Sequence, residues 1–394
     1  MRRVSAWFLA GGLVTFAATS VLSISLATIA LAVALAGALG LLLQREPWPV
    51  DRNVAMAVGI YLALKLITVL TAVDVRHSLR EFFEYWPYLV FLAIPFTVKA
   101  GPRRVALLRI LAVSVAVASV YAVVQHFVGV DYLRDRMLGN PHGRYRATSF
   151  FFHHLTWGGY ALFASLFFAG QCPRGKRDRI LFRVTAVLAL LGILATYARG
   201  PVAGLVFGLV VYLFVRRSAW KIAGAAVAVT ALALIFTPGL FDRFQSAAAI
   251  DLNPNAAESR TGIWLSAWAI GEAHPLTGVG PGNFAAAFEQ FKVNPHLLPV
   301  GHAHNQWLDE WATSGVLGFM GFNILFGTVA LALWRRRRQA DGLPAAALAA
   351  WCGLAAAALF ECHFSDAEVL MLALFGAGLG LLPGSKTAEE ENGD

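Results

Sequence analysis

Apolar runs long enough to cross a bilayer repeat along almost the whole chain, and they constrain the fold more than any other feature. In a lipid interior every backbone N–H and C=O group must be paired within the protein, so a run of roughly 20 apolar residues predicts a membrane-spanning helix. Hydrophobic residues make up 58% of the 394 residues and charged residues only 14%, which is outside the range of soluble domains. We therefore predict an all-α polytopic membrane protein with about 12 transmembrane helices. The runs start near Ala6, Ile24, Val54, Tyr85, Val105, Leu155, Leu181, Val202, Ile222, Val316, Ala345 and Val369.

The basic residues predict how these helices are oriented. Lys and Arg stay preferentially on the cytoplasmic side of short loops, and about twice as many fall on the side of the N-terminus as on the opposite side. We expect both termini in the cytoplasm and all ten histidines at the external face. The net charge of +9 is then mostly a topological signal, and no basic domain is present to bind nucleic acid. The start, Met1-Arg2-Arg3 before an apolar run, also resembles a secretory signal, but without a small-residue cleavage site we expect a retained first helix.

One long polar segment divides the chain into three parts. We predict transmembrane helices 1–9 in residues 1–237, an external catalytic loop in residues 238–312, and helices 10–12 with a cytoplasmic tail in residues 313–394. Aromatic residues recur at helical spacing within the loop, so we expect it to contain helices that lie on the bilayer surface and are anchored there by those aromatic rings. The stripe consists of Phe284, Phe288 and Phe291.

Two external arginines stand at predicted helix starts. Arginine on this face slightly opposes the expected topology, so another requirement should keep it there. Arg199 ends the seventh apolar run two residues before Pro201, which suits the first turn of a helix, where unpaired N–H groups and the helix dipole favour an anion. Arg260 precedes Trp264 by one helical turn. Both guanidinium groups are candidate phosphate ligands, and lipid headgroups are the alternative partner of Arg199.

Three motifs, taken in order, resemble the O-antigen ligase and polymerase family of envelope polysaccharide assembly. The first is the Thr-x-x-Arg-Gly ending at residues 196–200, and the second is the Ser-Arg helix followed by a His-Pro-Leu-x-Gly-x-Gly run at residues 259–284. The third and most specific is the pair His304-Asn305 followed by Gly315 and Gly318. Ala198 departs from the family, which often has serine there, and puts any role of that hydroxyl in doubt.

The resemblance implies a GT-C-like membrane fold and a glycosyl transfer on the periplasmic face of the bacterial inner membrane. The donor would be a glycan on undecaprenyl diphosphate, and the acceptor a lipid A-core oligosaccharide. Because an imidazole can accept a proton near neutral pH, His304 is suited to deprotonate the acceptor hydroxyl, which predicts inversion at the anomeric carbon. Arg199 and Arg260 would absorb the charge of the departing diphosphate. Since no acidic metal-ligand cluster is visible in the external segments, we expect neither a metal nor another cofactor.

Further external residues are predicted to bind donor or acceptor. A cluster between residues 134 and 146 is rich in arginine and suits phosphate or anionic sugars, with lipid headgroups as the alternative partner. Glu310 is a candidate for orienting the site, but no carboxylate next to His304 can be identified. Lys65 lies inside the third apolar run, near enough to its external end for the ammonium group to reach water. The predicted binding residues are Arg136, Arg144, Arg146, His274, His302 and Asn305.

Other functions remain open at this point. An O-antigen polymerase would share the donor and use a lipid-linked repeat unit as acceptor, and Arg260 and Gly271 have a spacing found in polymerases. A protein O-oligosaccharyltransferase is disfavoured by the short segment after the last apolar run. A lipid-linked glycan transporter would carry charges near mid-membrane, whereas the apolar runs here contain few charges. A purely structural scaffold would have no use for ordered external arginines and histidines.

Overall fold

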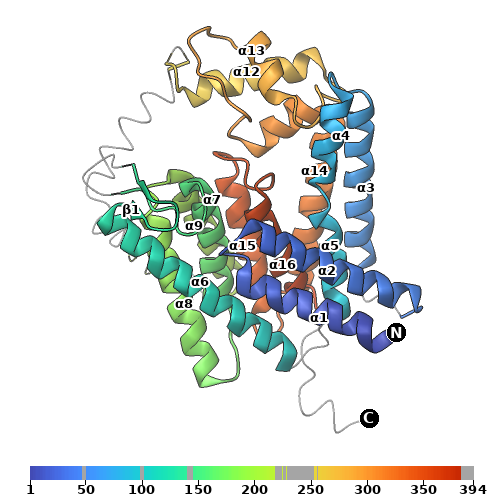
Figure 1. The fold of residues 1–394 in the computed structure, drawn as a ribbon, viewed down its shortest axis with the longest axis vertical. Coiled ribbons are helices and arrows are strands. Elements are labelled where there is room, and N and C mark those ends of the chain that lie inside the picture. The colour runs from blue at the N-terminus through green and yellow to red at the C-terminus, as the bar shows by residue number, and fades with distance from the viewer. Residues whose placement is uncertain are drawn as a thin grey trace.

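The chain is almost entirely helical in the computed structural model, which describes residues 1–46, 50–97, 102–139, 145–217, 224, 228, 253–254 and 256–382. The helices are α1 (Arg2–Thr19), α2 (Ile24–Leu43), α3 (Arg52–Leu70), α4 (Val75–Phe83), α5 (Pro87–Thr97), α6 (Pro102–Val128), α7 (His154–Ala169), α8 (Lys176–Leu194), α9 (Arg199–Val215), α12 (Arg260–Ala273), α13 (Phe284–Phe291), α14 (Gln306–Arg336), α15 (Leu343–Ala357) and α16 (Ala367–Gly380). The short strands β1 (Val130–Asp131) and β2 (Arg136–Met137) pair antiparallel. Figure 1 shows α12 and α13 together at one end of a larger helical body.

The described helices agree with the predicted apolar runs. Helices α2, α3, α6 and α14 are long and apolar enough to cross a membrane, and α9, α15 and α16 are shorter apolar helices. Within the described residues, each predicted run starts inside a helix, except the run at Tyr85, which starts two residues before α5. The run near Ile222 lies outside the described residues. The all-α membrane fold is therefore confirmed, and the number of twelve spans stays a prediction.

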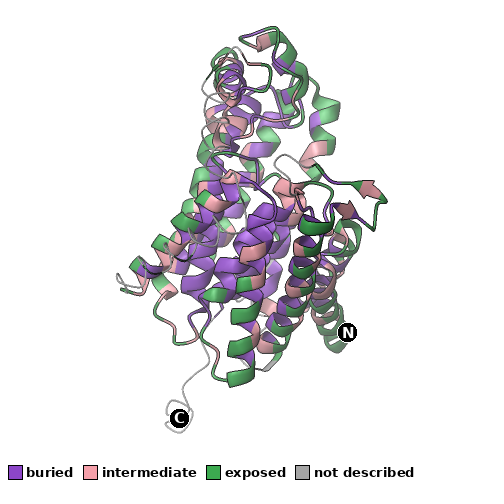
Figure 2. Cartoon of the chain, turned by 90° about the vertical axis from the view of Figure 1, so that its left-hand side faces the viewer, coloured by how far each residue is buried: buried purple, intermediate pink, exposed green. Residues whose placement is uncertain are grey.

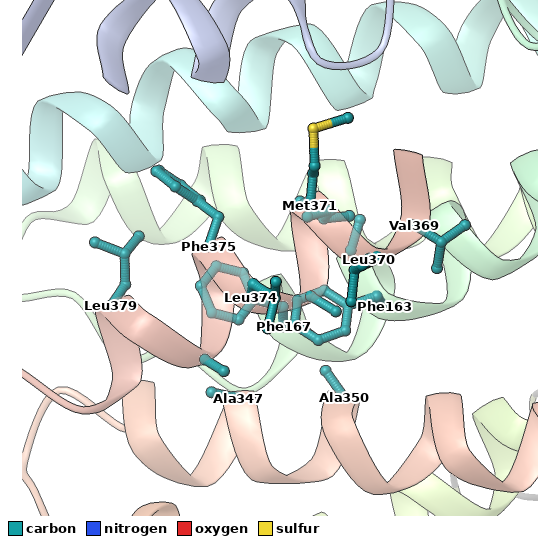
Figure 3. Close-up of a cluster of buried hydrophobic side chains, with 14 of the residues drawn as sticks. Phe163, Phe167, Ala347, Ala350, Val369, Leu370, Met371, Leu374, Phe375 and Leu379 are labelled. Atoms are coloured by element: carbon teal, nitrogen blue, oxygen red, sulfur yellow. The ribbon is translucent and has the colours of Figure 1, made fainter. Parts of the chain in front are cut away.

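The centre of the helical body is formed by α7, α15 and α16, which are buried along almost their whole length (Figure 2). Leu374 and Phe375 of α16 belong to the same hydrophobic cluster as Phe163 and Phe167 of α7 (Figure 3). These interlocked aromatic and aliphatic side chains fix the axis of α7. The position of the first residue of α7, which matters for the site below, is fixed with it.

Helices α9 and α15 cross at very short range because glycines face each other. A Cβ atom on Gly204 would lie 2.4 Å from the carbonyl oxygen of Gly353, and one on Gly208 would lie 2.7 Å from the carbonyl oxygen of Ala349. Small residues allow the backbones of membrane helices to approach in this way, and the close contact contributes dispersion energy. The crossing holds the start of α9, and with it Arg199, against the central helices.

Helix α14 is interrupted at Gly315, which has the left-handed φ of 58° that glycine adopts without strain. The break frees backbone groups in the middle of an apolar helix, where they must find partners. The His-Pro-Leu-x-Gly-x-Gly run supplies them: its backbone bonds to both sides of the break. The bonds run from Val279 N to Ala312 O, Gly280 N to Thr313 O, Val316 N to Pro275 O and Leu317 N to Leu276 O. Two of the three recognised motifs are thus halves of one structural element.

Lys65 and Glu310 form a buried ion pair between α3 and α14. Lys65 Nζ lies 2.7 Å from Glu310 Oε2 and donates a hydrogen bond of 2.7 Å to Ser314 Oγ, while Tyr61 donates its hydroxyl to Glu310 Oε1 at 2.9 Å. The prediction that Lys65 reaches water was wrong, since its exposed fraction is 1%. Both carboxylate oxygens of Glu310 are engaged by Lys65 and Tyr61, so Glu310 does not orient the site. The apolar helices therefore contain a buried charge pair, which stands near the break in α14.

The predicted surface anchoring of the phenylalanine stripe was also wrong. Phe284 and Phe288 are buried in a second hydrophobic cluster, with Ile263 and Ile270 of α12 and Leu297. The stripe thus forms the core that holds α12, α13 and the connecting loops together. Helix α14 begins at Gln306, inside the predicted loop of residues 238–312. Ala312 of this helix belongs to the second cluster, so the small core is continuous with the start of α14.

Candidate active site

A cavity of about 430 Å³ lies where the N-terminal ends of several helices meet. It is bounded by the starts of α7, α9 and α12, the segment just before α14, and the connection between α15 and α16. The three motifs contribute Arg199, Arg260 and His304 to this one cavity. Its lining residues are Arg146, His153, His154, Leu155, Tyr197, Ala198, Arg199, Gly200, Pro201, Glu258, Arg260, His304, Phe360 and Glu361.

Helix N-termini give one side of the cavity an affinity for anions. The first N–H groups of a helix lack partners within it, and the helix dipole places partial positive charge at the same end. Ala198 occupies the N-cap of α9 and provides no side-chain cap, so the Gly200 amide is left to other acceptors. Arg199 and Arg260 are the first residues of α9 and α12. Full positive charges therefore stand beside two helix starts.

Arg146 adds a third guanidinium group that is poorly compensated. Burial, and after it the positive charge of Arg199, lowers the pKa of Arg146, while Glu258 acts in the opposite direction. The buried Nε of Arg146 has no hydrogen-bond partner among the described residues. An anion with several acceptor oxygens would satisfy this donor and offset the repulsion between Arg146 and Arg199. The part of the cavity lined by Arg146, Arg199 and Arg260 is called the cationic end.

His304 lines the same cavity and has a strained backbone. Its φ of 48° lies in the left-handed region, which residues other than glycine adopt uncommonly and which tends to mark functional sites. Asn305 forms the N-cap of α14, and its side chain accepts hydrogen bonds from the amides of Trp307 and Leu308. The helix thus starts directly after His304. The Asn of the His-Asn motif fixes the backbone, and the His lines the cavity.

Glu361 is the carboxylate that orients the His304 ring. Nδ1 of His304 lies 3.1 Å from Oε2 and 3.2 Å from Oε1 of Glu361. Burial by itself would raise the pKa of Glu361, but the hydrogen bond from His304 and the charges of His304 and His302 outweigh it and lower the pKa to about 2. An ionised carboxylate only accepts hydrogen bonds, so Nδ1 of His304 carries the proton. In the neutral ring Nε2 is then the basic nitrogen.

Gln306 brings Glu361 to His304 across a long sequence separation. The Gln306 side chain accepts a hydrogen bond from Phe364 N at 3.0 Å and donates one to Ser365 Oγ at 3.0 Å, and its backbone N–H donates to Ala358 O. These three bonds attach the α15–α16 connection to the first residue of α14. Glu361 was not among the residues predicted from the sequence, although this connection was expected on the external face. An acidic residue there, between two apolar runs, was the available signal.

Several residues predicted to bind substrate lie elsewhere. Arg136 is bound to Asp131, with Nε 3.0 Å from Oδ2, and to the carbonyl of Phe152, so its hydrogen-bonding groups serve the β1–β2 hairpin. His274 is the C-cap of α12, with its ring against Phe291. Neither residue lines the cavity, so its geometry gives no support to their predicted binding roles. Arg144 lies outside the described residues.

Two other predicted binding residues lie next to His304 without lining the cavity. Asn305 is the helix cap described above. The His302 ring is 4.3 Å from that of His304, and its Nε2 lies 3.5 Å from Glu361 Oε1. Of the predicted binding residues within the described ranges, Arg146 is the one that faces the cavity itself.

His302, His304 and Glu361 also form a possible cation site. One ligand atom from each residue lies within 4.8 Å of the others, and two imidazoles with a carboxylate suit a transition metal ion. A metal bound between these groups would take Nδ1 of His304 and leave the proton on Nε2. The same ring would then lack its basic nitrogen, so metal binding here and a general-base role of His304 exclude each other.

Glu361→Gln is expected to remove a pH-dependent part of the stability. Because the pKa is lowered from 4.5 to about 2, the stabilisation is complete above pH 4.5 and is lost as the pH falls from 4.5 towards 2. A shift of this size corresponds to roughly 3 kcal/mol. The Tm of the wild type in lipid nanodiscs, measured between pH 7 and pH 3, should fall more steeply than that of Glu361→Gln. The exposed Glu289→Gln serves as control, and parallel curves for wild type and Glu361→Gln would contradict the assignment.

Comparison with known proteins agrees with the motifs. Residues 184–323 match the family model described as O-antigen ligase. The matched segment runs from α8 to α14 and includes Arg199, Arg260 and His304, while Arg146 and Glu361 reach the same cavity from outside it. The curated proteins contain no match to this chain.

Proposed function

We propose, from the chain's place in the O-antigen ligase family, that it transfers O-antigen glycan from undecaprenyl diphosphate to lipid A-core oligosaccharide on the periplasmic face of the inner membrane. The family supports a glycosyltransferase of lipopolysaccharide biosynthesis that acts on lipid-linked glycans. The observation that carries the finer proposal is the single cavity that is lined by three arginines and by the His304–Glu361 pair. The reaction proceeds without a metal and inverts the anomeric configuration.

The cationic end binds the diphosphate of the donor. Arginine donates two parallel hydrogen bonds to phosphate oxygens, and the helix starts of α9 and α12 add amide donors and dipoles. Negative charge grows on the leaving oxygen as the glycosidic bond breaks, and preorganised cations stabilise that charge more in the transition state than in the ground state. Arg146, Arg199 and Arg260 therefore perform the task that a metal ion performs in many sugar transferases.

His304 activates the acceptor. Nε2 of His304 takes the proton of a sugar hydroxyl as its oxygen attacks the anomeric carbon, and the bond from that carbon to the diphosphate oxygen breaks with its electron pair. Undecaprenyl diphosphate leaves at the cationic end, and the proton remains on the imidazole, where Glu361 stabilises the positive charge. Base and leaving-group site flank the reacting carbon from opposite sides, which gives inversion.

A reconstituted transfer assay tests the proposal. The purified protein in liposomes receives undecaprenyl-diphosphate glycan and lipid A-core, with and without a chelator, and products are separated by size. Glycan on lipid A-core in the presence of chelator is the expected result. Transfer only to a lipid-linked repeat unit would identify a polymerase, and transfer only to an added acceptor protein a protein glycosyltransferase. Loss of activity in chelator would instead favour the cation site, and absence of any transfer would favour a transporter.

Arg199→Lys and Arg260→Lys are expected to lower kcat by about 10- to 100-fold, and the alanine variants by about 10² to 10³. Lysine keeps the charge but loses the paired donors that match a phosphate. Arg80→Ala is the matched control, because Arg80 lies on α4 and does not line the cavity. An alanine variant at Arg199 or Arg260 with wild-type kcat would contradict the role of the cationic end.

A further inference from the structure

We propose that His153 is a second functional histidine of the cavity and that its Nε2–H donates a hydrogen bond to the acceptor sugar. The inference rests on the proposed glycosyl transfer and extends it to the binding of the acceptor. His153 belongs to none of the three motifs and lies outside the matched segment, but its side chain lines the same cavity as His304.

The tautomer of His153 is set by the start of α7. His153 is the N-cap of this helix, with extended φ and ψ of −119° and 142°, and its Nδ1 accepts a hydrogen bond from Leu155 N at 3.3 Å. A ring nitrogen that accepts a hydrogen bond carries no proton, so the neutral ring has its proton on Nε2. Histidine is an unusual N-cap, since Ser, Thr, Asp and Asn fill this position best. Capping alone therefore does not explain the histidine. Its Nε2–H group lies farther from the backbone than any polar atom of Ser, Thr, Asp or Asn, so it can reach a ligand in the cavity.

The start of α7 lies against the α15–α16 connection, which carries Glu361. Thr156, in the first turn of α7, donates a hydrogen bond to Asp366 Oδ2 at 2.6 Å, and His153, His304 and Glu361 all line the cavity. The acceptor hydroxyl is therefore placed between His153 and His304. A neutral imidazole there donates to an uncharged hydroxyl oxygen without competing with the arginines for the diphosphate. Holding the hydroxyl oxygen from one side directs its proton towards Nε2 of His304.

The β1–β2 hairpin holds His153 in this position. Arg136 donates to the carbonyl oxygen of Phe152 at 2.7 Å, and its guanidinium group lies 4.6 Å from the centre of the Phe152 ring. Arg134 donates to the carbonyl oxygen of Phe150 at 2.6 Å. Asp131, which is fully buried, accepts hydrogen bonds from both arginines. The arginines predicted to bind phosphate thus position the residues directly before His153.

The test separates the cap from the donor. In His153→Asn the side-chain oxygen can still accept from Leu155 N, so α7 stays capped, but the short amide does not reach the place of Nε2. We expect an unchanged Tm, an unchanged KM for the undecaprenyl-diphosphate glycan, and a KM for lipid A-core raised roughly 3- to 10-fold, as for the loss of one neutral hydrogen bond. His153→Ala should raise the same KM and also lower the Tm. Asp74→Asn, an equivalent cap exchange at the start of α4, is the control and should change neither KM.

The possible results have distinct meanings. His153→Asn with wild-type KM for lipid A-core would overturn the inference and leave His153 as a helix cap only. A raised KM for the donor in place of the acceptor would overturn it as well. His153→Ser, which also caps a helix and lacks the ring, repeats the test if the Asn variant does not fold. Wild-type protein that transfers no glycan would contradict the proposed function itself, whereas an active wild type with unaltered variants would contradict this inference alone.

Discussion

His304→Ala is expected to lower the rate of glycan transfer by about 10² to 10⁴, the usual contribution of a general base, and to change the KM for the donor little. The physical reason is that Glu361 holds the proton on Nδ1 of His304 and leaves Nε2 as the basic nitrogen in the cavity. The measurement is single-turnover transfer of glycan to lipid A-core by purified protein in liposomes. Activity within tenfold of the wild type would contradict the role of His304.

The backbone at His304 calls for a second variant. Alanine tolerates a φ of 48° less well than asparagine, so His304→Ala is also expected to lower the Tm slightly. His304→Asn keeps this backbone preference and still lacks the base, so it should lose the same activity without the loss of stability. His296→Ala, an exposed histidine on the preceding loop and outside the cavity, is the matched control. Equal activity losses in His304→Ala and His304→Asn, with different Tm values, would separate chemistry from folding.

The sequence predicted the site as far as local signals reach. Arg199, Arg260 and His304 each stand at or just before a helix start, where Pro201, Ser259 and Asn305 supply recognisable helix-start signals. Arg146 was predicted from its arginine-rich cluster, whereas Glu361 and His153 carry no such signal, because their place in the site depends on tertiary contacts. The bond between Gln306 and Phe364 that brings Glu361 to His304 joins residues 58 positions apart. Such a pairing cannot be read from periodicity or spacing.

The fold was predicted well where hydropathy alone decides it. Apolar runs fixed the positions of the helices, but the same scale misjudged polar residues that the protein itself buries. Lys65 was expected to reach water because it lies near the external end of its apolar run, and its partner Glu310 is far away in the sequence. The phenylalanine stripe of α13 was assigned to the bilayer surface, but it packs into a core of the protein itself. An amphipathic pattern shows that a face is buried, but not whether protein or lipid covers it.

The break in α14 links these observations to the chemistry. Gly315 interrupts the helix nine residues after its start at Gln306, and the glycine-rich loop after His274 fills the break with backbone hydrogen bonds. The first part of α14 is therefore held by α3 and the loop on one side and by the α15–α16 connection on the other. Asn305 caps this part of the helix, and Glu310 lies within it. Loss of the Lys65–Glu310 pair is for this reason expected to disturb the position of His304, which lies directly before the N-cap of α14.

Lys65→Met is expected to destabilise the protein by about 3–5 kcal/mol, because it leaves the Glu310 carboxylate buried and unpaired between α3 and α14. Methionine preserves the length of the side chain, so the loss of packing is small. The Tm in lipid nanodiscs should fall clearly below that of the wild type, and the transfer rate should fall with it, since α14 carries the site. Arg45→Met, at an exposed connection, is a control for removing a cation and should change the Tm little.

The double variant Lys65→Met with Glu310→Gln decides what the pair does. Replacing both charges removes the uncompensated carboxylate, and the amide oxygen of Gln can still accept the hydrogen bond from the Tyr61 hydroxyl. Most of the lost Tm should therefore return, since the charges stabilise each other more than they stabilise the fold. Recovery of both Tm and transfer rate would make the pair a structural brace for α14. A double variant that recovers its Tm but not its rate would show that the charges act on the reaction itself, and a single variant as stable as the wild type would contradict the buried ion pair.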